Sequence, residues 1–317
     1  MSVGSGTGRL RVEIVRGPGL GTPDDALLAF GYGSFPENAT GFGCRVETGL
    51  SVVDETPALE LWRAASPVAA GAEGDVRHAS GGGLLGGFID LDEAKFGGVA
   101  EAAEAAYRLM GEFLARCPER HVLRVWNFLD AINAGDGDGE RYRQFCVGRA
   151  RGLGDRPPER LPAATAVGRP AASGRVQVCW LSGRDPGEPV ENPRQVRAYR
   201  YPRQYGPSPP AFARAMRLAS GELIGSGTSS IVGHESRHEG DLASQVGETL
   251  QNLRELHRAG GGDGQPTGVK VYLREPSEAH EVARQVGEGL VTAMPPLLIA
   301  ADICRRELLV EIECLWS

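Results

Sequence analysis

One order of predicted elements occurs twice along this chain. In each copy, the spacing of apolar residues predicts a strand, a long helix, another strand, a second helix and closing strands. Helices are expected at residues 99–117, 141–150, 241–258 and 276–289. Strands are expected at residues 10–15, 124–129, 175–180, 225–232, 269–273, 297–300 and 308–313. A repeat of this length indicates that one α/β module has been duplicated and fused.

The repeat determines the expected fold and its boundaries. We predict the α/β (α+β) class, with two modules in tandem, each a mixed sheet packed by helices. Residues 1–180 are expected to form the N-terminal module together with an N-terminal extension, and residues 216–317 the C-terminal module. Residues 181–215, which are rich in Pro, Arg and Tyr, are expected to form a bridge between the two.

Charge and composition argue against several classes of protein. A net charge of −7 does not provide the basic surface of a nucleic-acid-binding protein. No stretch approaches the roughly 20 apolar residues of a membrane span, and residues 1–6 do not resemble the start of a secretion signal. The six cysteines are scattered without a Cys-x-x-Cys pair, as is typical of reduced thiols. We therefore expect a cytoplasmic protein with neither nucleic acid nor a membrane as a partner.

Residues 234–238 read His-Glu-Ser-Arg-His, which is the spacing of zinc metalloproteases. Two histidines four residues apart share one face only when they lie on a helix. Residues 231–233 instead predict the end of a strand, and residues 239–241 predict a turn into the next helix. We therefore expect a loop rather than a metal site in this segment.

The last predicted strand carries two acidic side chains, Glu311 and Glu313. Because side chains alternate along a strand, both point to one face, while Val310 and Ile312 point to the other. A carboxyl group that is buried keeps a raised pKa and can act as a general acid. The alternation alone leaves open which of the two glutamates has this role, and whether both are simply solvated.

Several motifs of the second copy look like the RidA/YjgF module. They are Ser229–His234, Gly240–Asp241, Gln245, Asn252–Leu253, Val271–Leu273 and Val310–Glu313. The first copy is similar but less clear, through Trp126–Leu129, Tyr142, Phe145 and Pro162–Gly168. That family usually places an arginine after Pro-Ala to hold the substrate carboxylate, whereas Ala164 and Pro296 stand here. The difference argues against imine deamination.

Three longer segments, residues 141–149, 199–206 and 231–236, resemble the chorismatases, specifically the FkbO-like family. The resemblance implies two RidA-like halves with the substrate pocket on the C-terminal half, and neither a metal nor an organic cofactor. It implies chorismate as the substrate and the release of pyruvate. RidA modules form trimers, and a tandem fusion replaces one such interface internally, so both a monomer and a homotrimer are expected possibilities.

Chorismate carries a ring carboxylate and an enolpyruvyl carboxylate, and cleavage of its enol ether requires protonation of the vinyl carbon. The resemblance assigns that proton to Glu311. Two carboxylates require at least two cationic clamps, for which Arg149 and Arg200 are the first candidates. Tyrosines in the same segments are expected to donate hydrogen bonds or stack on the ring, and small serines to line it. The expected substrate-binding residues are Tyr142, Arg149, Arg200, Tyr201, Tyr205, Arg214, Ser229 and Ser230.

Cys304 lies seven residues before Glu311. In the chorismatases, a cysteine at this spacing marks the branch that aromatises the ring to 3-hydroxybenzoate, so Cys304 is expected beside the ring as the second catalytic residue. Two alternatives stay open. One is a hydrolase that gives a dihydroxycyclohexadiene carboxylate and pyruvate, and the other is a RidA-like ligand-binding protein without catalysis.

Overall fold

The structure is a computed structural model of the 317-residue chain, and it describes residues 10–17, 23–33, 44–169, 173–262, 264–292 and 294–317. The opening residues 1–6, on which the expectation about secretion rests, lie outside the described residues. Among the described residues, no helix has both the length and the apolar character needed to cross a membrane.

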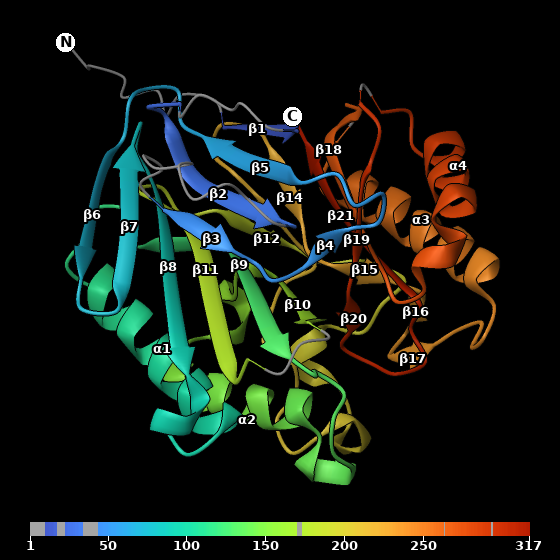
Figure 1. Ribbon diagram of the computed structural model, residues 1–317, viewed down its shortest axis with the longest axis horizontal. Coiled ribbons are helices and arrows are strands. Elements are labelled where there is room, and N and C mark those ends of the chain that lie inside the picture. The colour runs from blue at the N-terminus through green and yellow to red at the C-terminus, as the bar shows by residue number, and fades with distance from the viewer. Residues whose placement is uncertain (1–9, 18–22, 34–43, 170–172, 263, 293) are drawn as a thin grey trace.

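The N-terminal half forms a seven-stranded sheet in the order β20-β10-β9-β11-β8-β7-β6 (Figure 1). Its strands are β6 (Ala69–Glu73), β7 (Val76–Gly81), β8 (Leu84–Asp92), β9 (His121–Asp130), β10 (Ala163–Arg169), β11 (Arg175–Gly183) and β20 (Asp302–Ile303). Helices α1 (Val99–Leu114) and α2 (Arg141–Leu153) cover one face. Their apolar sides, including Tyr107 and Phe145, pack in one core with Val125 and Trp180 of the sheet.

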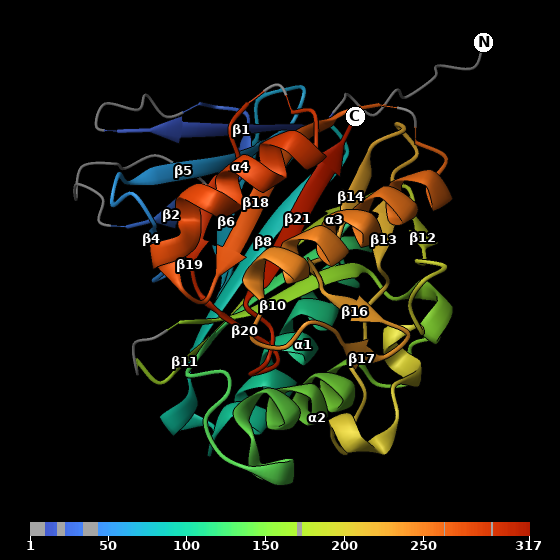
Figure 2. The same cartoon turned by 90° about the vertical axis from the view of Figure 1, so that its right-hand side faces the viewer.

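The C-terminal half forms an eight-stranded sheet in the order β12-β13-β14-β21-β18-β19-β4, with β15 paired to β21. Its strands are β4 (Ser51–Val52), β12 (Glu188–Val190), β13 (Ala215–Arg217), β14 (Leu223–Gly225), β15 (Thr228–Ser229), β18 (Pro266–Leu273), β19 (Leu297–Ala300) and β21 (Val310–Trp316). Figure 2 shows α3 (Leu242–Ala259) and α4 (Ala279–Gly289) lying side by side across this sheet. Asp241 is the N-cap of α3, because its side chain accepts a hydrogen bond from the Ser244 amide at 3.0 Å.

The two halves share one topology. In the first, β9 pairs with β10 in parallel and with β11 antiparallel, and β11 pairs antiparallel with β8. In the second, β18 pairs with β19 in parallel and with β21 antiparallel, and β21 pairs antiparallel with β14. Helices occupy equivalent positions between these strands. The predicted mixed α/β fold built from two like modules is confirmed.

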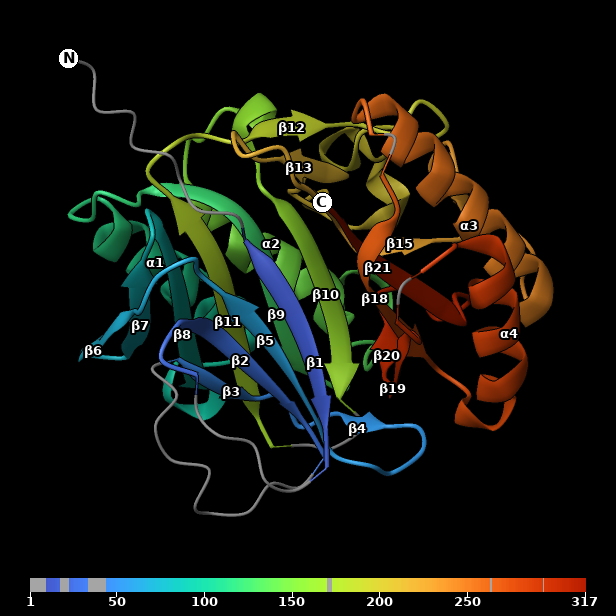
Figure 3. The ribbon, with the colours of Figure 1, turned by 90° about the horizontal axis from the view of Figure 1, so that it is seen from above.

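The N-terminal extension contributes a four-stranded sheet that the sequence pattern did not predict in full. Its order is β1-β5-β2-β3, with β1 (Arg11–Arg16), β2 (Ala26–Tyr32), β3 (Arg45–Glu47) and β5 (Ala58–Arg63). Strand β2 is buried along its whole length, so it lacks the polar–apolar alternation that marks a half-exposed strand. Figure 3 shows these strands lying over β9 and β11. Phe30 and Trp62 there contact Trp126 with ring centroids 5.0 and 4.7 Å apart, so the extension belongs to the core between the modules.

The modules also exchange edge strands. The short strand β20 from the C-terminal half pairs with β10 of the first sheet. Strand β4 from the N-terminal extension pairs with β19 of the second sheet. Strand β11 continues to Gly183, and β12, at residues 188–190, already belongs to the C-terminal sheet. The expected boundaries at residues 180 and 215 therefore do not separate two independent bodies.

Candidate active site

A cavity of about 480 Å³ lies between the two modules, within the usual size of small-molecule sites. The N-terminal half lines it with α2 and β10, and the C-terminal half with β15, β21 and the segment after β20. The bridge contributes Tyr201, Gln204, Tyr205, Pro210, Phe212 and Arg214. The expected pocket of the C-terminal half is thus corrected to a pocket at the junction, because β10 and α2 form one of its walls.

Eight of the ten predicted site residues line this cavity. They are Tyr142, Arg149, Tyr201, Tyr205, Arg214, Ser229, Cys304 and Glu311. Arg200 does not: it is exposed at the end of the short helix Ala198–Arg200. Ser230 does not line it either, because its buried hydroxyl donates instead to the Arg237 carbonyl at 3.0 Å.

Glu311 lies in the middle of the C-terminal sheet, where it is paired in register with Ser229 on one side and Tyr272 on the other. Its carboxyl group is only 5% exposed and receives a hydrogen bond from Ser229 Oγ at 3.3 Å. Within the described chain it forms no ion pair. Burial, reinforced by the negative charge of Glu313, raises the pKa of Glu311 to about 8. The side chain is thus a neutral carboxylic acid at neutral pH.

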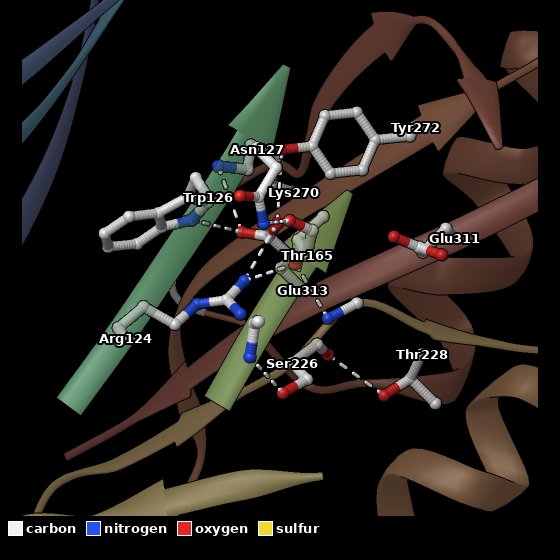
Figure 4. A network of polar contacts seen from close by, with 12 residues as sticks. Arg124, Trp126, Asn127, Thr165, Ser226, Thr228, Lys270, Tyr272, Glu311 and Glu313 are labelled. Atoms are coloured by element: carbon white, nitrogen blue, oxygen red, sulfur yellow. Dashed lines mark hydrogen bonds and ion pairs between the residues drawn. The ribbon is translucent and has the colours of Figure 1, made fainter. Parts of the chain in front are cut away.

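Glu313 shares the face of Glu311, as the alternation predicts, but has different neighbours (Figure 4). Its carboxylate is 3.0 Å from Arg124 Nη2 and 3.0 Å from Lys270 Nζ. Although burial favours the neutral acid, Lys270 and Arg124 outweigh it and lower the pKa of Glu313 to about 2. Of the two glutamates, Glu311 is therefore the one that its surroundings hold in the neutral form.

Two buried guanidinium groups face the cavity. Arg149 is 2% exposed, contacts Cys146 Sγ at 3.5 Å and lies over the Phe145 ring at 5.3 Å. Arg214 is 4% exposed and donates to Tyr201 Oη at 2.7 Å. In the part of the chain that the structure describes, neither is ion-paired and the Nε atom of each lacks a partner. Buried guanidinium groups that have no ion-pair partner favour the binding of an anion.

Cys304 lines the same cavity. Burial raises the pKa of this thiol far above its usual range, and ionisation of Glu311 at alkaline pH raises it further. The raised pKa favours the protonated thiol over the thiolate at this position.

The sequence reasoning missed Thr165 and Gly227, which join the modules beside Glu311. The Thr165 hydroxyl accepts from the Gly227 amide at 2.9 Å and also contacts Arg124. A Cβ on Gly227 would lie 2.1 Å from Glu311 Oε1, so only glycine leaves room for the carboxyl group. No local pattern marks these positions, because Thr165 is one residue in an alanine-rich strand and Gly227 one of many glycines.

Arg305 was also missed, although it directly follows Cys304. Its guanidinium lies over the Tyr205 ring at 4.0 Å and the Tyr201 ring at 5.2 Å. It also donates to the His234 carbonyl and to Ser236 Oγ, both at 3.0 Å. Arg305 thus joins the bridge to the hairpin that follows β15, at the wall of the cavity.

The His-Glu-Ser-Arg-His segment, residues 234–238, does not form a helix, which agrees with the sequence analysis. Strands β16 (Ile231–Val232) and β17 (Glu235–Ser236) form a hairpin through it. His234 Nδ1 is 3.2 Å from Tyr205 Oη, whereas His238 Nε2 is 3.1 Å from a carboxylate oxygen of Glu248. The two histidines therefore have separate partners. The described residues contain no group of three or more His, Cys, Asp or Glu side chains suited to a metal ion.

Comparison with known proteins identifies the family. The profile described as "Chorismatase FkbO/Hyg5-like, N-terminal" matches residues 60–182. A 3-hydroxybenzoate synthase of Streptomyces hygroscopicus is 38% identical over 68% of this chain and 69% of its own length. A chorismatase of Streptomyces rapamycinicus is 34% identical over 86% of each chain. The crystal structure of a chorismatase at 1.08 Å resolution superposes with a TM-score of 0.86 at 30% identity, covering 98% of this chain and 99% of that one. The chain therefore belongs to the FkbO/Hyg5-like chorismatase family.

Proposed function

We propose that this protein converts chorismate into 3-hydroxybenzoate and pyruvate, with Glu311 as the general acid. The observation that carries the proposal is a buried, neutral carboxyl group in a cavity that also contains two buried guanidinium groups. An acid and two cations are what a dianionic enol ether requires.

Arg149 and Arg214 would each hold one carboxylate of chorismate. Arg214 takes the place that the sequence analysis gave to Arg200, which lies outside the cavity. A bound dianion neutralises both guanidinium groups, whose burial otherwise disfavours their charge. Tyr142, Tyr201 and Tyr205 line the same space and would pack against the ring.

Glu311 would donate its proton to the methylene carbon of the enolpyruvyl group, whose double-bond electrons form the new C–H bond. The resulting cation is stabilised by the ether oxygen. The neighbouring ring hydroxyl oxygen then bonds to the cationic carbon, and its proton passes to the ether oxygen. The bond from the ether oxygen to the pyruvyl carbon breaks, and so does the bond from the former hydroxyl oxygen to the ring. The former hydroxyl oxygen thus leaves as the pyruvate carbonyl oxygen, and the former ether oxygen stays on the ring as the phenol oxygen. The carboxylate of Glu311 takes up the ring proton lost on aromatisation and becomes an acid again. Chorismate and the two products together have the same atoms, so no water or oxidant is consumed.

The choice of product rests on Cys304. In the hydrolase alternative, water adds to the cation and both ring oxygens stay on the ring. A protonated thiol beside Glu311 occupies space near the ring without acting as a base, which favours exclusion of water from the cation. The relative named 3-hydroxybenzoate synthase supports the aromatising outcome, whereas the relatives named chorismatase leave the product open.

Product analysis tests the proposal directly. The protein is incubated with chorismate, the ring product is identified by chromatography and mass spectrometry, and pyruvate is measured with lactate dehydrogenase. We expect 3-hydroxybenzoate and pyruvate in equal amounts. A ring product heavier by one water would establish the hydrolase instead, and no pyruvate above an E311Q control would favour a ligand-binding protein.

A further inference from the structure

Behind Glu311 lies a buried cluster of charged side chains that the proposed proton transfer does not itself use (Figure 4). We call Glu60, Arg124, Lys270 and Glu313 the charge cluster. Each is 6% exposed or less, and each comes from a different strand: β5, β9, β18 and β21. Lys270 Nζ is 2.8 Å from Glu60 and 3.0 Å from Glu313, which also contacts Arg124 at 3.0 Å. Two positive and two negative charges balance one another.

Glu313 is surrounded by donors. Its Oε1 atom forms an ion pair with Arg124 and accepts a hydrogen bond from the Tyr272 hydroxyl at 3.2 Å. Its Oε2 atom forms an ion pair with Lys270 and accepts a hydrogen bond from the Trp126 indole N–H at 3.2 Å. Four donors on two oxygens hold the group as a carboxylate. Glu311, two residues away and thus roughly 7 Å along an extended strand, receives only Ser229.

We propose that Glu313 is a charge-setting residue of the reaction, a fixed negative charge that keeps the proton on Glu311 while the cavity is empty. This inference rests on the proposed function, because it concerns the acid that cleaves the enol ether. Glu313 does not touch the cavity and acts only through Glu311. Glu311 is therefore already protonated when the substrate binds.

The other charged and titratable groups around Glu311 do not replace this role. Arg214 and Arg124 favour the ionised form of Glu311, and Glu313 opposes them. Cys304 and Tyr272 are neutral, because burial raises the pKa of each well above its usual range. One charge at roughly 7 Å and an effective dielectric constant of about 20 corresponds to about 1 to 2 pH units. A change of that size in a variant is readily measured.

Two substitutions should shift the pKa of Glu311 in opposite directions. E313Q keeps the size of the side chain and removes the negative charge, so the pKa of Glu311 should fall by about 1 to 2 pH units. K270M removes a positive charge from the other side of Glu313, so the same pKa should rise. K270R keeps the charge and serves as the matched control, with no shift expected.

The titration is read in the full-length protein without substrate, from the infrared band of the protonated carboxyl group assigned by difference against E311Q. The pH profile of kcat/KM is recorded in parallel. Opposite shifts of the Glu311 pKa in E313Q and K270M support the inference. If one variant does not fold, the direction of the pKa shift in the other variant tests the inference. Equal titrations in the parent and the variants would overturn it and leave the charge cluster with a structural role only. A protein that titrates as expected but does not release pyruvate would refute the proposed function alone.

Discussion

Glu311 and Glu313 point to the same face of β21, yet Glu313 lies 3.0 Å from two cations while Glu311 receives a single hydroxyl hydrogen bond from Ser229. This difference in partners gives two chemically identical side chains opposite protonation states at neutral pH. Of the two, the neutral Glu311 is the one that lines the cavity.

The activity should depend on pH through Glu311. Because the acid form is the active one and its pKa is raised to about 8, kcat/KM should be constant below pH 8 and fall tenfold per unit above it. The measurement is the initial rate of pyruvate release against pH at low chorismate concentration. A rate that rises through this range would mean that the ionised form of Glu311 is the active one.

Replacing Glu311 by glutamine should separate catalysis from folding. E311Q lacks the transferable proton, so kcat should fall by about 10² to 10⁴-fold, while chorismate still binds in isothermal titration. Retention of parental turnover would show that another group is the acid.

The same variant should alter the dependence of stability on pH. The pKa of Glu311 is raised from about 4.5 to about 8 on folding, so its contribution to stability is complete below pH 4.5 and is lost as the pH rises through 8. E311Q has no proton to lose and should therefore unfold at a higher temperature than the parent above pH 8. Thermal unfolding of both proteins across this range checks the sign, and parallel curves would contradict it.

Arg149 and Arg214 should each contribute to substrate binding. Truncation of one partner of a buried charged pair costs about 2 to 5 kcal/mol, so R149M and R214M should each raise KM roughly 30-fold or more. R200M is the matched control, because Arg200 is exposed and outside the cavity, and its KM should equal that of the parent. A large effect in R200M would restore Arg200 as a clamp.

Gly227 should tolerate no side chain. A Cβ there would lie 2.1 Å from Glu311 Oε1, so G227A should displace the carboxyl group and reduce kcat at least tenfold, since a misplacement of about 1 Å can cost 10²-fold. G247A on α3 is the control: its Cβ would meet nothing within 4 Å, and alanine there should stabilise the helix by about 0.5–1 kcal/mol. Steady-state kinetics and thermal unfolding of both variants test the contrast.

Most of the fold follows from local patterns in the sequence. Period-two and period-3.6 spacings predict the central strands and four helices of the repeat. Strand β2 escapes this reasoning because it is buried along its whole length and so shows no alternation. The single strand expected at residues 225–232 is instead three short ones, and Gly227, which lies against the Glu311 carboxyl group, separates the first two.

Some residues of the candidate site could likewise be predicted from the sequence, and others could not. The motifs that carry the family resemblance include Tyr142, Arg149 and Glu311, and all three line the cavity. Arg200 and Arg214 lie in neighbouring segments and are the same residue type, so only the packing of the bridge shows which one faces the cavity. Thr165 and Arg305 acquire meaning only from contacts with residues distant in sequence.

The sequence by itself determined the duplicated module, the family resemblance and the presence of two carboxyl groups on one face of the last strand. Tertiary structure decided which of them retains a proton. The reason is that Arg124 and Lys270 reach Glu313 from β9 and β18, and the energy of a buried charge depends on such neighbours rather than on its place in the chain.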